Sequence, residues 1–344
     1  MIRMVLRMLT YAKEFQMEKV KLGIIGAGGL STKKIYPSLL YIPEVKLEAV
    51  CDLDENKAKR NAEKFGANLV FTRMEQMLDE AELDAVIICI GPEQHAQLAP
   101  IVLKARLPVY TEKPPAVDAA GALAVARVAK DTGQLCMTAF KKRYTPLYVR
   151  MKEQMGTDRF GKPAMLVMQR SFSRYNNSSP RSTFLLDFCI HLIDLAPWLM
   201  GKVTAVHALS PEPNTWAIQM VFESGAAGSL AFCAHTSGVY PDEQVTIYGE
   251  DDAMLFVRDG HSLTFVHDRV YHTLHQINLT TAGQEGLVES GFLSEIQAFI
   301  KAVQTADRSV VQSDIASSYR SMLAHDSIVQ SARTGQWVEL KYEI

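Results

Sequence analysis

Hydrophobic positions in the first part of the chain form short continuous runs, of which Ala85-Val-Ile-Ile-Cys-Ile90 is an example. Such runs are typical of parallel strands that are buried on both faces of a sheet. Helical patterns separate the runs, and Asp54 and Asp118 stand at the starts of two of them as candidate caps. This alternation predicts a doubly wound α/β domain. Its strands are expected at residues 20–26, 45–51, 69–71, 84–90, 108–111 and 134–139, and its helices at 32–41, 55–65 and 119–130.

The pattern changes after about residue 144, where apolar and polar positions begin to alternate. Alternation is typical of strands with one buried and one solvent-facing side. Helical segments are expected only near residues 188–200, 289–304 and 313–333. The second half is therefore predicted to be an α+β domain, with a large, mostly antiparallel open sheet and helices on one face. Its strands are expected at 164–172, 203–209, 216–222, 228–234, 244–249, 253–257 and 262–266.

A length of 344 residues agrees with two domains, at roughly 150 residues for each. We expect an extension at residues 1–18, the α/β domain at 19–140 and the α+β domain at 141–344. The extension is interpreted as a disordered segment or as the product of a start codon upstream of Met17. An amphipathic surface anchor is the alternative, because Arg3 and Arg7 lie among apolar residues.

The charged residues nearly balance, with 36 Lys and Arg against 38 Asp and Glu and a net charge of −2. This balance argues against a nucleic-acid or membrane partner, and no apolar run approaches the roughly 18 residues of a membrane span. The histidines between His261 and His275 are not spaced as a metal site, so no metal is predicted. The odd number of dispersed cysteines favours reduced thiols and a cytoplasmic location; they are Cys51, Cys89, Cys136, Cys189 and Cys233.

A cluster of glycines directly follows the first predicted strand and precedes a helical pattern. Gly26 permits a tight turn, and Gly28 allows a pyrophosphate to approach the bare backbone. Gly29 and Leu30 complete the turn, and the third position of the dinucleotide fingerprint is Ser31 where glycine or alanine is usual. An ordinary strand–helix turn is the alternative interpretation.

Asp52 lies 24 residues beyond Gly28, at the end of the next predicted strand. A carboxylate at this place can accept hydrogen bonds from both ribose hydroxyls of NAD, and it would repel the additional phosphate of NADP. NAD is therefore predicted over NADP. The alternative is an Asx turn that precedes the cap residue Asp54.

Two further loops are expected at the same edge of the sheet, where doubly wound folds bind ligands. The first carries Gly91, Pro92 and His95, and the second carries Glu112 and Lys113. A lysine there can hydrogen-bond a substrate hydroxyl and help to move its proton. An ordinary surface lysine before a proline-rich turn is the alternative.

Asp187 and His191 are four residues apart, so they share one face if the segment is helical. Asp187 would then orient a ligand or the imidazole, while Phe188, Leu192 and Leu199 would pack on the opposite side. The alternative for His191 is a buried structural histidine. Pro197 is expected to kink or end this helix.

Taken together, these motifs resemble the glucose–fructose oxidoreductase / inositol dehydrogenase (Gfo/Idh/MocA) family over residues 20–340. The resemblance is carried by the glycine turn, by Pro92-x-x-His95, by Glu112-Lys113-Pro114 and by Asp187-x-x-x-His191. It implies a Rossmann domain followed by a substrate-binding domain that also mediates oligomerisation. A homodimer or a homotetramer is expected by this analogy.

The resemblance also implies the chemistry, which is NAD(P)-dependent hydride transfer at a hydroxyl-bearing carbon of a sugar, inositol or related polyol. It implies that Lys113 contacts the reacting hydroxyl of the substrate and that His191 acts as general acid/base. Asp187 would orient the substrate or the histidine. Glu112, Pro92 and His95 would line the nicotinamide, and the Lys113–Pro114 bond is expected to be cis. An NAD-dependent hydrolase of glycosides and a non-catalytic dinucleotide-binding regulator are the alternatives.

The substrate itself does not follow from the resemblance, because the segment before Asp187 departs from the family pattern. The basic stretch Lys141-Lys-Arg143-Tyr144 and the pair Arg174-Tyr175 are the candidate substrate-side groups. A solvated basic surface is the alternative. The near-neutral net charge suits an uncharged polyol.

Overall fold

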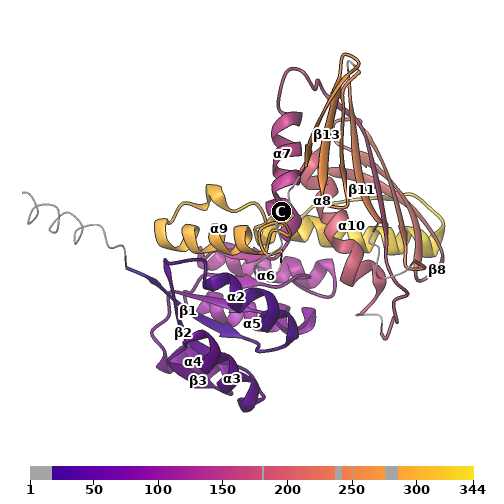
Figure 1. The fold of residues 1–344 in the computed structure, drawn as a ribbon. Helices are drawn as coiled ribbons and strands as arrows, with labels where there is room; N and C mark the ends of the chain where they lie inside the picture. The colour runs from indigo at the N-terminus through magenta and orange to yellow at the C-terminus, as the bar shows by residue number, and fades with distance from the viewer. Residues whose placement is uncertain (1–17, 180–181, 237–241, 251, 276–285) are drawn as a thin grey trace, which may run out of the picture.

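The computed structural model describes residues 18–179, 182–236, 242–250, 252–275 and 286–344. Within these residues the chain forms two sheets, which lie side by side with helices between them (Figure 1). Most of the extension predicted at residues 1–18 lies outside the described residues. Both fold classes predicted from the hydrophobic pattern are confirmed.

The first sheet has six parallel strands in the order β3-β2-β1-β4-β5-β6. The chain reverses its direction across the sheet between β1 and β4, which is the switch point where such folds bind ligands. All four residues of β4 are fully buried, as expected for a strand that is covered on both faces. The strands are β1 (Val20–Ile25), β2 (Val45–Cys51), β3 (Leu69–Phe71), β4 (Ala85–Ile88), β5 (Val109–Thr111) and β6 (Cys136–Thr138).

Two helices of this domain begin and end as predicted. Asp54 caps α3 (Glu55–Phe65) by accepting from the N–H groups of Asn56 and Lys57, and Asp118 caps α6 (Ala119–Thr132) in the same way at Gly121. Both helices end at a glycine with positive φ. The remaining helices that flank the sheet are α4 (Met74–Glu80) and α5 (Pro92–Lys104).

The helix predicted at residues 32–41 is present but has an unexpected start. It opens with a π-helical turn, η1 (Ser31–Ile35), and continues as the short α2 (Tyr36–Leu39). A π turn depends on local backbone geometry more than on a hydrophobic repeat, so the sequence pattern gave no signal for it.

The second sheet has nine strands in the order β14-β13-β12-β11-β7-β10-β9-β8-β15. Its pairs are antiparallel except for β10 and β7. Burial alternates as predicted: along β9 the side chains of Ile218, Met220 and Phe222 are buried, whereas Val221 and its neighbours on the other face are exposed. The strands are β7 (Pro163–Ser171), β8 (Val203–Glu212), β9 (Thr215–Phe222), β10 (Ala227–Cys233), β11 (Asp242–Gly249), β12 (Met254–Arg258), β13 (Ser262–His267), β14 (Val270–His275) and β15 (Val338–Glu339).

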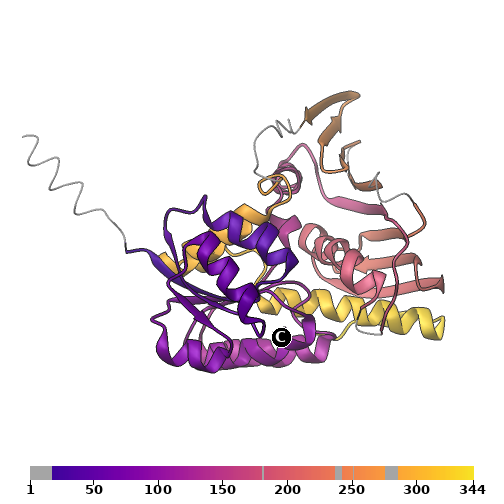
Figure 2. The same cartoon turned by 60° about the horizontal axis from the view of Figure 1, so that its bottom comes forward.

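Helices cover the inner face of this sheet and connect it to the first domain. The long α10 (Ile315–Thr334) packs against β8, against α8 (Ile190–Met200) and against α6 of the Rossmann domain. Figure 2 shows α10 running between the nine-stranded sheet and the Rossmann helices. The other helical segments are η2 (Lys141–Tyr144), α7 (Pro146–Met155), η3 (Leu185–Cys189) and η4 (Arg308–Val310).

α8 does not end at Pro197, which was one of the two outcomes expected there. The helix continues through this proline to Met200, and the N–H of Gly201 still bonds to the Pro197 carbonyl. Proline removes one backbone hydrogen bond, but Leu195, Leu199 and Met200 are buried around it and hold the last turn in place.

The helix α9 (Phe292–Thr305) returns from the second half of the chain to the first domain. Its side chains Ile296 and Phe299 share a core with Leu22 and Tyr110 of the Rossmann sheet, and the Tyr110 and Phe299 rings are 5.7 Å apart. In Figure 1 this helix lies beside the elements of the first domain. The chain after residue 141 therefore builds parts of both domains.

Across the part of the chain that the structure describes, no helix is long and apolar enough to cross a membrane. The same residues contain no group of three or more His, Cys, Asp or Glu side chains placed to hold a metal ion. All five cysteines are free thiols, and all except the half-buried Cys233 are buried.

Candidate active site

A cavity of about 430 Å³ collects residues from both domains at the carboxyl edge of the Rossmann sheet. The Rossmann loops contribute Leu30, Glu112, Lys113 and Ala139, while η2, β7 and η3 contribute the opposite wall. Its lining residues are Leu30, Glu112, Lys113, Ala139, Lys141, Lys142, Arg170, Tyr175, Asp187, Phe188, His191 and Phe292. Lys113, Asp187 and His191, predicted as catalytic from two separate motifs, all lie in this one cavity.

Lys113 stands in the turn that follows β5. Its backbone N–H donates to the Glu112 carboxylate at 3.0 Å, and the Lys113–Pro114 bond is cis, as the family resemblance implied. The ammonium Nζ crosses the cavity and donates to the backbone carbonyl of Asp187 at 2.9 Å. Lys113 is therefore held at both ends, with its charge directed into the cavity.

Asp187 lies in the π turn η3, immediately before α8. Its Oδ2 accepts hydrogen bonds from the hydroxyls of Tyr175 and Ser182, so the carboxylate is fixed in orientation. Burial, followed by the bond to Asp187, raises the pKa of Tyr175, which keeps this phenol protonated as a donor. Tyr175, predicted as a substrate-side group, thus lines the cavity and also holds Asp187.

The position of Phe188 corrects the sequence-based prediction, which placed it on the face opposite Asp187. Phe188 lines the cavity, where its ring lies 4.5 Å from Phe172 and 5.3 Å from Tyr175. The prediction assumed α-helical spacing, but residues 185–189 form a π turn, which contains more residues and presents a broader set of side chains to one side.

His191 is 7% exposed, and its Nδ1 is buried with no hydrogen-bond partner among the described residues. Burial lowers the pKa of His191 well below 6.5, and the nearby cations Lys113, Lys141, Lys142 and Arg170 lower it further. The imidazole is therefore neutral near pH 7. A neutral imidazole can accept a proton from a group in the cavity.

A buried ion network forms the wall behind His191. Antiparallel pairing of β7 and β11 sets Arg170 directly opposite Glu243, and the Arg170 guanidinium bonds to Glu243 Oε2 at 3.0 Å. Glu243 Oε1 accepts from Lys142 and, at 2.8 Å, from the hydroxyl of Tyr148. Burial alone would raise the pKa of Glu243, but Lys142 and Arg170 outweigh it and hold the pKa at about 2.

Lys141 lies on the other side of the cavity, with its ammonium 4.1 Å from the centroid of the Phe292 ring. Burial, together with the neighbouring Lys142, lowers the pKa of Lys141 to about 8. Burial also raises the pKa of Glu112, one of whose oxygens has no partner among the described residues, and raises that of Glu295 behind it. Protonation is therefore favoured at both of these carboxyl groups, which interact electrostatically with Lys141.

The predicted cofactor side has the geometry of a dinucleotide turn. Gly26 has φ of +109°, and a Cβ there would lie 2.2 Å from the carbonyl oxygen of Cys89, so only glycine fits. Gly28, Gly29 and Leu30 are exposed, and a Cβ on Gly28 or Gly29 would meet nothing within 4 Å. The turn therefore offers open space beside bare backbone, where a phosphate could approach.

Asp52 lies beside this turn at the end of β2. One carboxylate oxygen accepts from the N–H of Ala27 at 2.7 Å and the other from the N–H of Asp54 at 2.9 Å. The Asx-type bond to Asp54, the alternative interpretation, is thus present. Each carboxylate oxygen can accept more than one hydrogen bond, so ribose hydroxyls can still bind.

The loop after β4 is organised by His95, which is fully buried and is not among the lining residues of the cavity. Its Nδ1 bonds to the Pro114 carbonyl at 2.9 Å, and its Nε2 accepts from the N–H of Ile90 at 3.2 Å. His95 therefore holds the loop of Gly91 and Pro92 against the cis-proline turn. Both ring nitrogens of His95 are used within the protein, and its predicted place beside the nicotinamide stays a prediction.

Three of the candidate substrate-side residues do not line the cavity. Arg143 is buried and forms a two-pronged ion pair with Asp194, with N···O distances of 2.9 and 2.6 Å. Tyr144 is buried, and its hydroxyl accepts from the N–H of Gln312 at 2.7 Å. Arg174 follows β7 but is not among the lining residues of the cavity. The basic stretch thus divides, because the 3₁₀ turn η2 directs Lys141 and Lys142 to the cavity and Arg143 to the core.

Sequence reasoning missed Arg170, Glu243 and Phe292. The register of β7 and β11 brings Arg170 and Glu243 together across 73 residues, and no local motif marks either one. Phe292 reaches the cavity because α9 returns to the Rossmann sheet. Arg170 could have been found from the alternating pattern of β7, because it lies on the same inward face as the buried Leu166 and Met168.

Comparison with known proteins agrees with this geometry. Residues 20–140 match the family described as "Oxidoreductase family, NAD-binding Rossmann fold" (GFO_IDH_MocA), and residues 152–340 match its "C-terminal alpha/beta domain". The first match ends at residue 140 and the second begins at residue 152.

Two curated relatives are inositol dehydrogenases. The chain is 29% identical to inositol 2-dehydrogenase 2 of Saccharopolyspora erythraea over 53% of its own length and 54% of the relative's. It is 30% identical to inositol 2-dehydrogenase of Rubrobacter xylanophilus over 62% and 63% of the two lengths. The matched region thus spans between half and two thirds of these relatives.

A solved structure with the same fold is an oxidoreductase from Agrobacterium radiobacter in complex with NAD+, L-tartaric acid and magnesium. The TM-score is 0.82 at 16% identity, over 93% of this chain and 98% of that one. At this identity the likeness concerns the fold alone.

Proposed function

The chain belongs to the Gfo/Idh/MocA family of NAD-dependent oxidoreductases, and from this premise we propose that it transfers a hydride between NAD and a hydroxyl-bearing carbon of a sugar, inositol or related polyol. The observation that carries the proposal is the convergence of Lys113, Asp187 and His191 on one cavity beside the dinucleotide turn. Lys113 comes from one motif and the Asp187/His191 pair from another, and together they supply the groups needed to bind an alcohol and to move its proton.

The residues of the glycine turn fit a dinucleotide. Open space beside Gly28 and Gly29 suits a pyrophosphate, and Asp52 at the end of β2 suits the ribose hydroxyls. NAD is proposed over NADP because Asp52 is anionic and the next residue, Leu53, is an exposed apolar side chain that offers no charge to a second phosphate. When bound, the nicotinamide supplies the hydride chemistry, and the protein supplies position and proton transfer.

Lys113 is proposed to hold the reacting oxygen. Its Nζ already donates to the Asp187 carbonyl, and two of its three hydrogens remain for a substrate hydroxyl. The positive charge would stabilise the negative charge that develops on this oxygen as the hydride leaves. His191, neutral and in the same cavity, would accept the hydroxyl proton, and Asp187 would position both the substrate and the Lys113 ammonium.

The test is a spectrophotometric scan of NAD reduction over a panel of sugars, inositols and related polyols. Lys113→Ala and His191→Ala should lose turnover while they keep NADH affinity, and full activity in both variants would contradict the assigned roles. Release of an aglycone from a glycoside without net NADH would favour the hydrolase alternative. NADH binding without turnover on any substrate would favour a regulator.

A homodimer or homotetramer is part of the proposal. The face of the nine-stranded sheet that carries no helix exposes Met165, Val221 and Tyr248, each 36–42% accessible. Analytical ultracentrifugation of the chain and of Met165→Lys tests this surface. A cytoplasmic location is also proposed, supported by five free cysteines.

A further inference from the structure

Positive charge is concentrated in the cavity. Lys113, Lys141, Lys142 and Arg170 all line it, and each lowers the pKa of the His191 imidazole. The carboxylates that could balance these four cations are fewer. Asp187 is the one carboxylate among the lining residues besides Glu112, and burial favours the protonated form of Glu112.

The negative charge of Glu243 is shared between two cations. Glu243 bonds to Lys142 through one oxygen and to Arg170 through the other, so a single negative charge faces two positive ones. The side chains of Lys142 and Arg170 are only 15% and 17% exposed, so water compensates them poorly.

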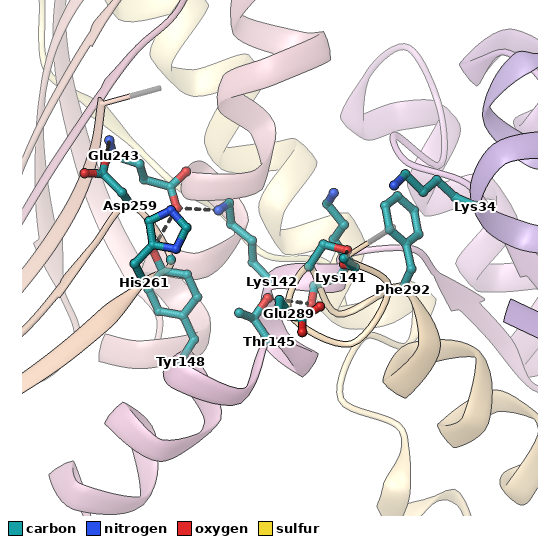
Figure 3. Close-up of a pocket in the computed structure, with 13 residues that line it drawn as sticks. Lys34, Lys141, Lys142, Thr145, Tyr148, Glu243, Asp259, His261, Glu289 and Phe292 are labelled. Atoms are coloured by element: carbon teal, nitrogen blue, oxygen red, sulfur yellow. Dashed lines mark hydrogen bonds and ion pairs between the residues drawn. The ribbon is translucent and has the colours of Figure 1, made fainter. Parts of the chain in front are cut away.

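Lys141 has fewer charged partners than Lys142 or Arg170. Its ammonium lies over the Phe292 ring and forms no hydrogen bond or ion pair with any described residue. A half-buried ammonium without an ion-pair partner is stabilised when a ligand supplies the anion. Lys141 and Lys142 also stand where this cavity meets a second one of about 360 Å³, which shares Lys141, Lys142 and Phe292 with it. Figure 3 shows Lys142 reaching Glu243 while Lys141 lies between Lys142 and Phe292.

We propose that the substrate is a sugar acid or another polyhydroxylated acid, whose carboxylate binds Lys141 and the Lys142–Arg170 pair while its reacting hydroxyl meets Lys113 and His191. This inference rests on the proposed function and narrows its substrate class. One carboxylate would offset part of the excess positive charge of the cavity. It would also raise the proton affinity of His191, which the four cations now lower, and so make this histidine a better base.

The experiment compares pairs of substrates that differ only in one carboxylate, namely D-gluconate with D-glucitol and D-glucuronate with D-glucose. NAD reduction gives kcat/KM, and calorimetric titration of the enzyme–NADH complex gives the affinity of the same compounds. We expect the acids to be preferred by about 10- to 100-fold, as a charge-assisted contact implies. Lys141→Gln should reduce the acid-to-neutral ratio by at least about tenfold, and Lys141→Arg should retain it.

Lys162→Gln is the matched control, because Lys162 is an exposed lysine that lines neither cavity, and it should leave both rates unchanged. Turnover of neutral polyols with no preference for acids would overturn the inference and leave the proposed function standing. Preference for glucose 6-phosphate over glucuronate would overturn the carboxylate assignment. Failure of the chain to bind NADH would overturn the proposed function itself, whereas tight binding of acids without turnover would uphold the anion site alone.

Discussion

The ammonium of Lys113 donates a hydrogen bond to the backbone carbonyl of Asp187 at 2.9 Å, although 74 residues separate them along the chain. One partner follows a Rossmann strand and the other lies in the π turn before α8. Because Lys113 bonds to a carbonyl, its charge is positioned without being neutralised. The bond thus orients a cation for substrate across the junction of the two domains.

Replacing Lys113 tests this orientation. Lys113→Met removes the charge but keeps most of the side-chain volume, and we expect kcat to fall by about 10²- to 10⁴-fold with little change in NADH affinity. Lys113→Arg should recover only part of the rate, since a planar guanidinium cannot occupy the same position. Steady-state kinetics and NADH fluorescence titration separate the two effects. A parallel loss of NADH affinity would instead assign Lys113 to cofactor binding.

Two glycines of the dinucleotide turn should respond differently to alanine. Gly26→Ala places a Cβ 2.2 Å from the Cys89 carbonyl at a φ of +109°, so we expect the free energy of unfolding to fall by at least about 3 kcal/mol. Gly28→Ala meets nothing within 4 Å, so its stability should stay within about 0.5 kcal/mol of the parent. The methyl group of this second variant would occupy the space proposed for the pyrophosphate and weaken NADH binding. Urea denaturation and NADH titration measure the two quantities, and normal NADH affinity in Gly28→Ala would contradict the proposed phosphate position.

His95 should make the protein less stable in acid. Burial lowers its pKa to about 4, whereas an unfolded chain has a histidine pKa near 6.5. Between these values the unfolded state binds a proton that the folded state does not, so the free energy of unfolding decreases as the pH falls, by up to about 1.4 kcal/mol per pH unit. His191 acts in the same direction.

His95→Asn keeps a donor near the Pro114 carbonyl but cannot titrate, so its stability should depend less on pH between 6.5 and 4. Urea denaturation over that range measures the slope. His272→Asn, on the exposed strand β14, serves as the control and should behave as the parent does. An unchanged slope in His95→Asn would contradict the assignment.

Arg143 should prove to be a structural residue. Arg143→Met leaves Asp194 fully buried without its cation, and we expect a loss of about 3 to 5 kcal/mol in the free energy of unfolding. The double variant Arg143→Met/Asp194→Leu should recover part of this loss, because no buried charge is left unpaired. Thermal denaturation measures both. Arg143→Lys should have an unchanged KM. A raised KM with normal stability would indicate that Arg143 contacts the substrate.

The sequence alone predicted both sheets and the residues that lead into the site. Runs such as Ala85–Ile88 and the caps Asp54 and Asp118 are local signals, and local signals also placed Gly26 and Lys113 at the edge of the sheet. The site depends in addition on non-local geometry. The charge of Arg170 became part of the cavity only through the pairing of β7 with β11, which no spacing rule reveals.

The direction of side chains within short turns could not be predicted from the sequence either. Lys142 and Arg143 are adjacent, yet η2 sends one to Glu243 and the other to Asp194. The π turn at residues 185–189 likewise brought Phe188 into the cavity with Asp187. The near-neutral net charge therefore suggested an uncharged substrate, whereas the local charge of the cavity favours an acid.

The return of α9 to the Rossmann sheet limits the modularity of this protein. A fragment ending at residue 140 would lack Ile296 and Phe299, and it would expose the apolar surface around Leu22 and Tyr110 that they now cover. A chimera that exchanges substrate domains at residue 140 would import a foreign α9 into the same core. New specificities are therefore better built by changing residues within the cavity than by exchanging domains at the sequence boundary.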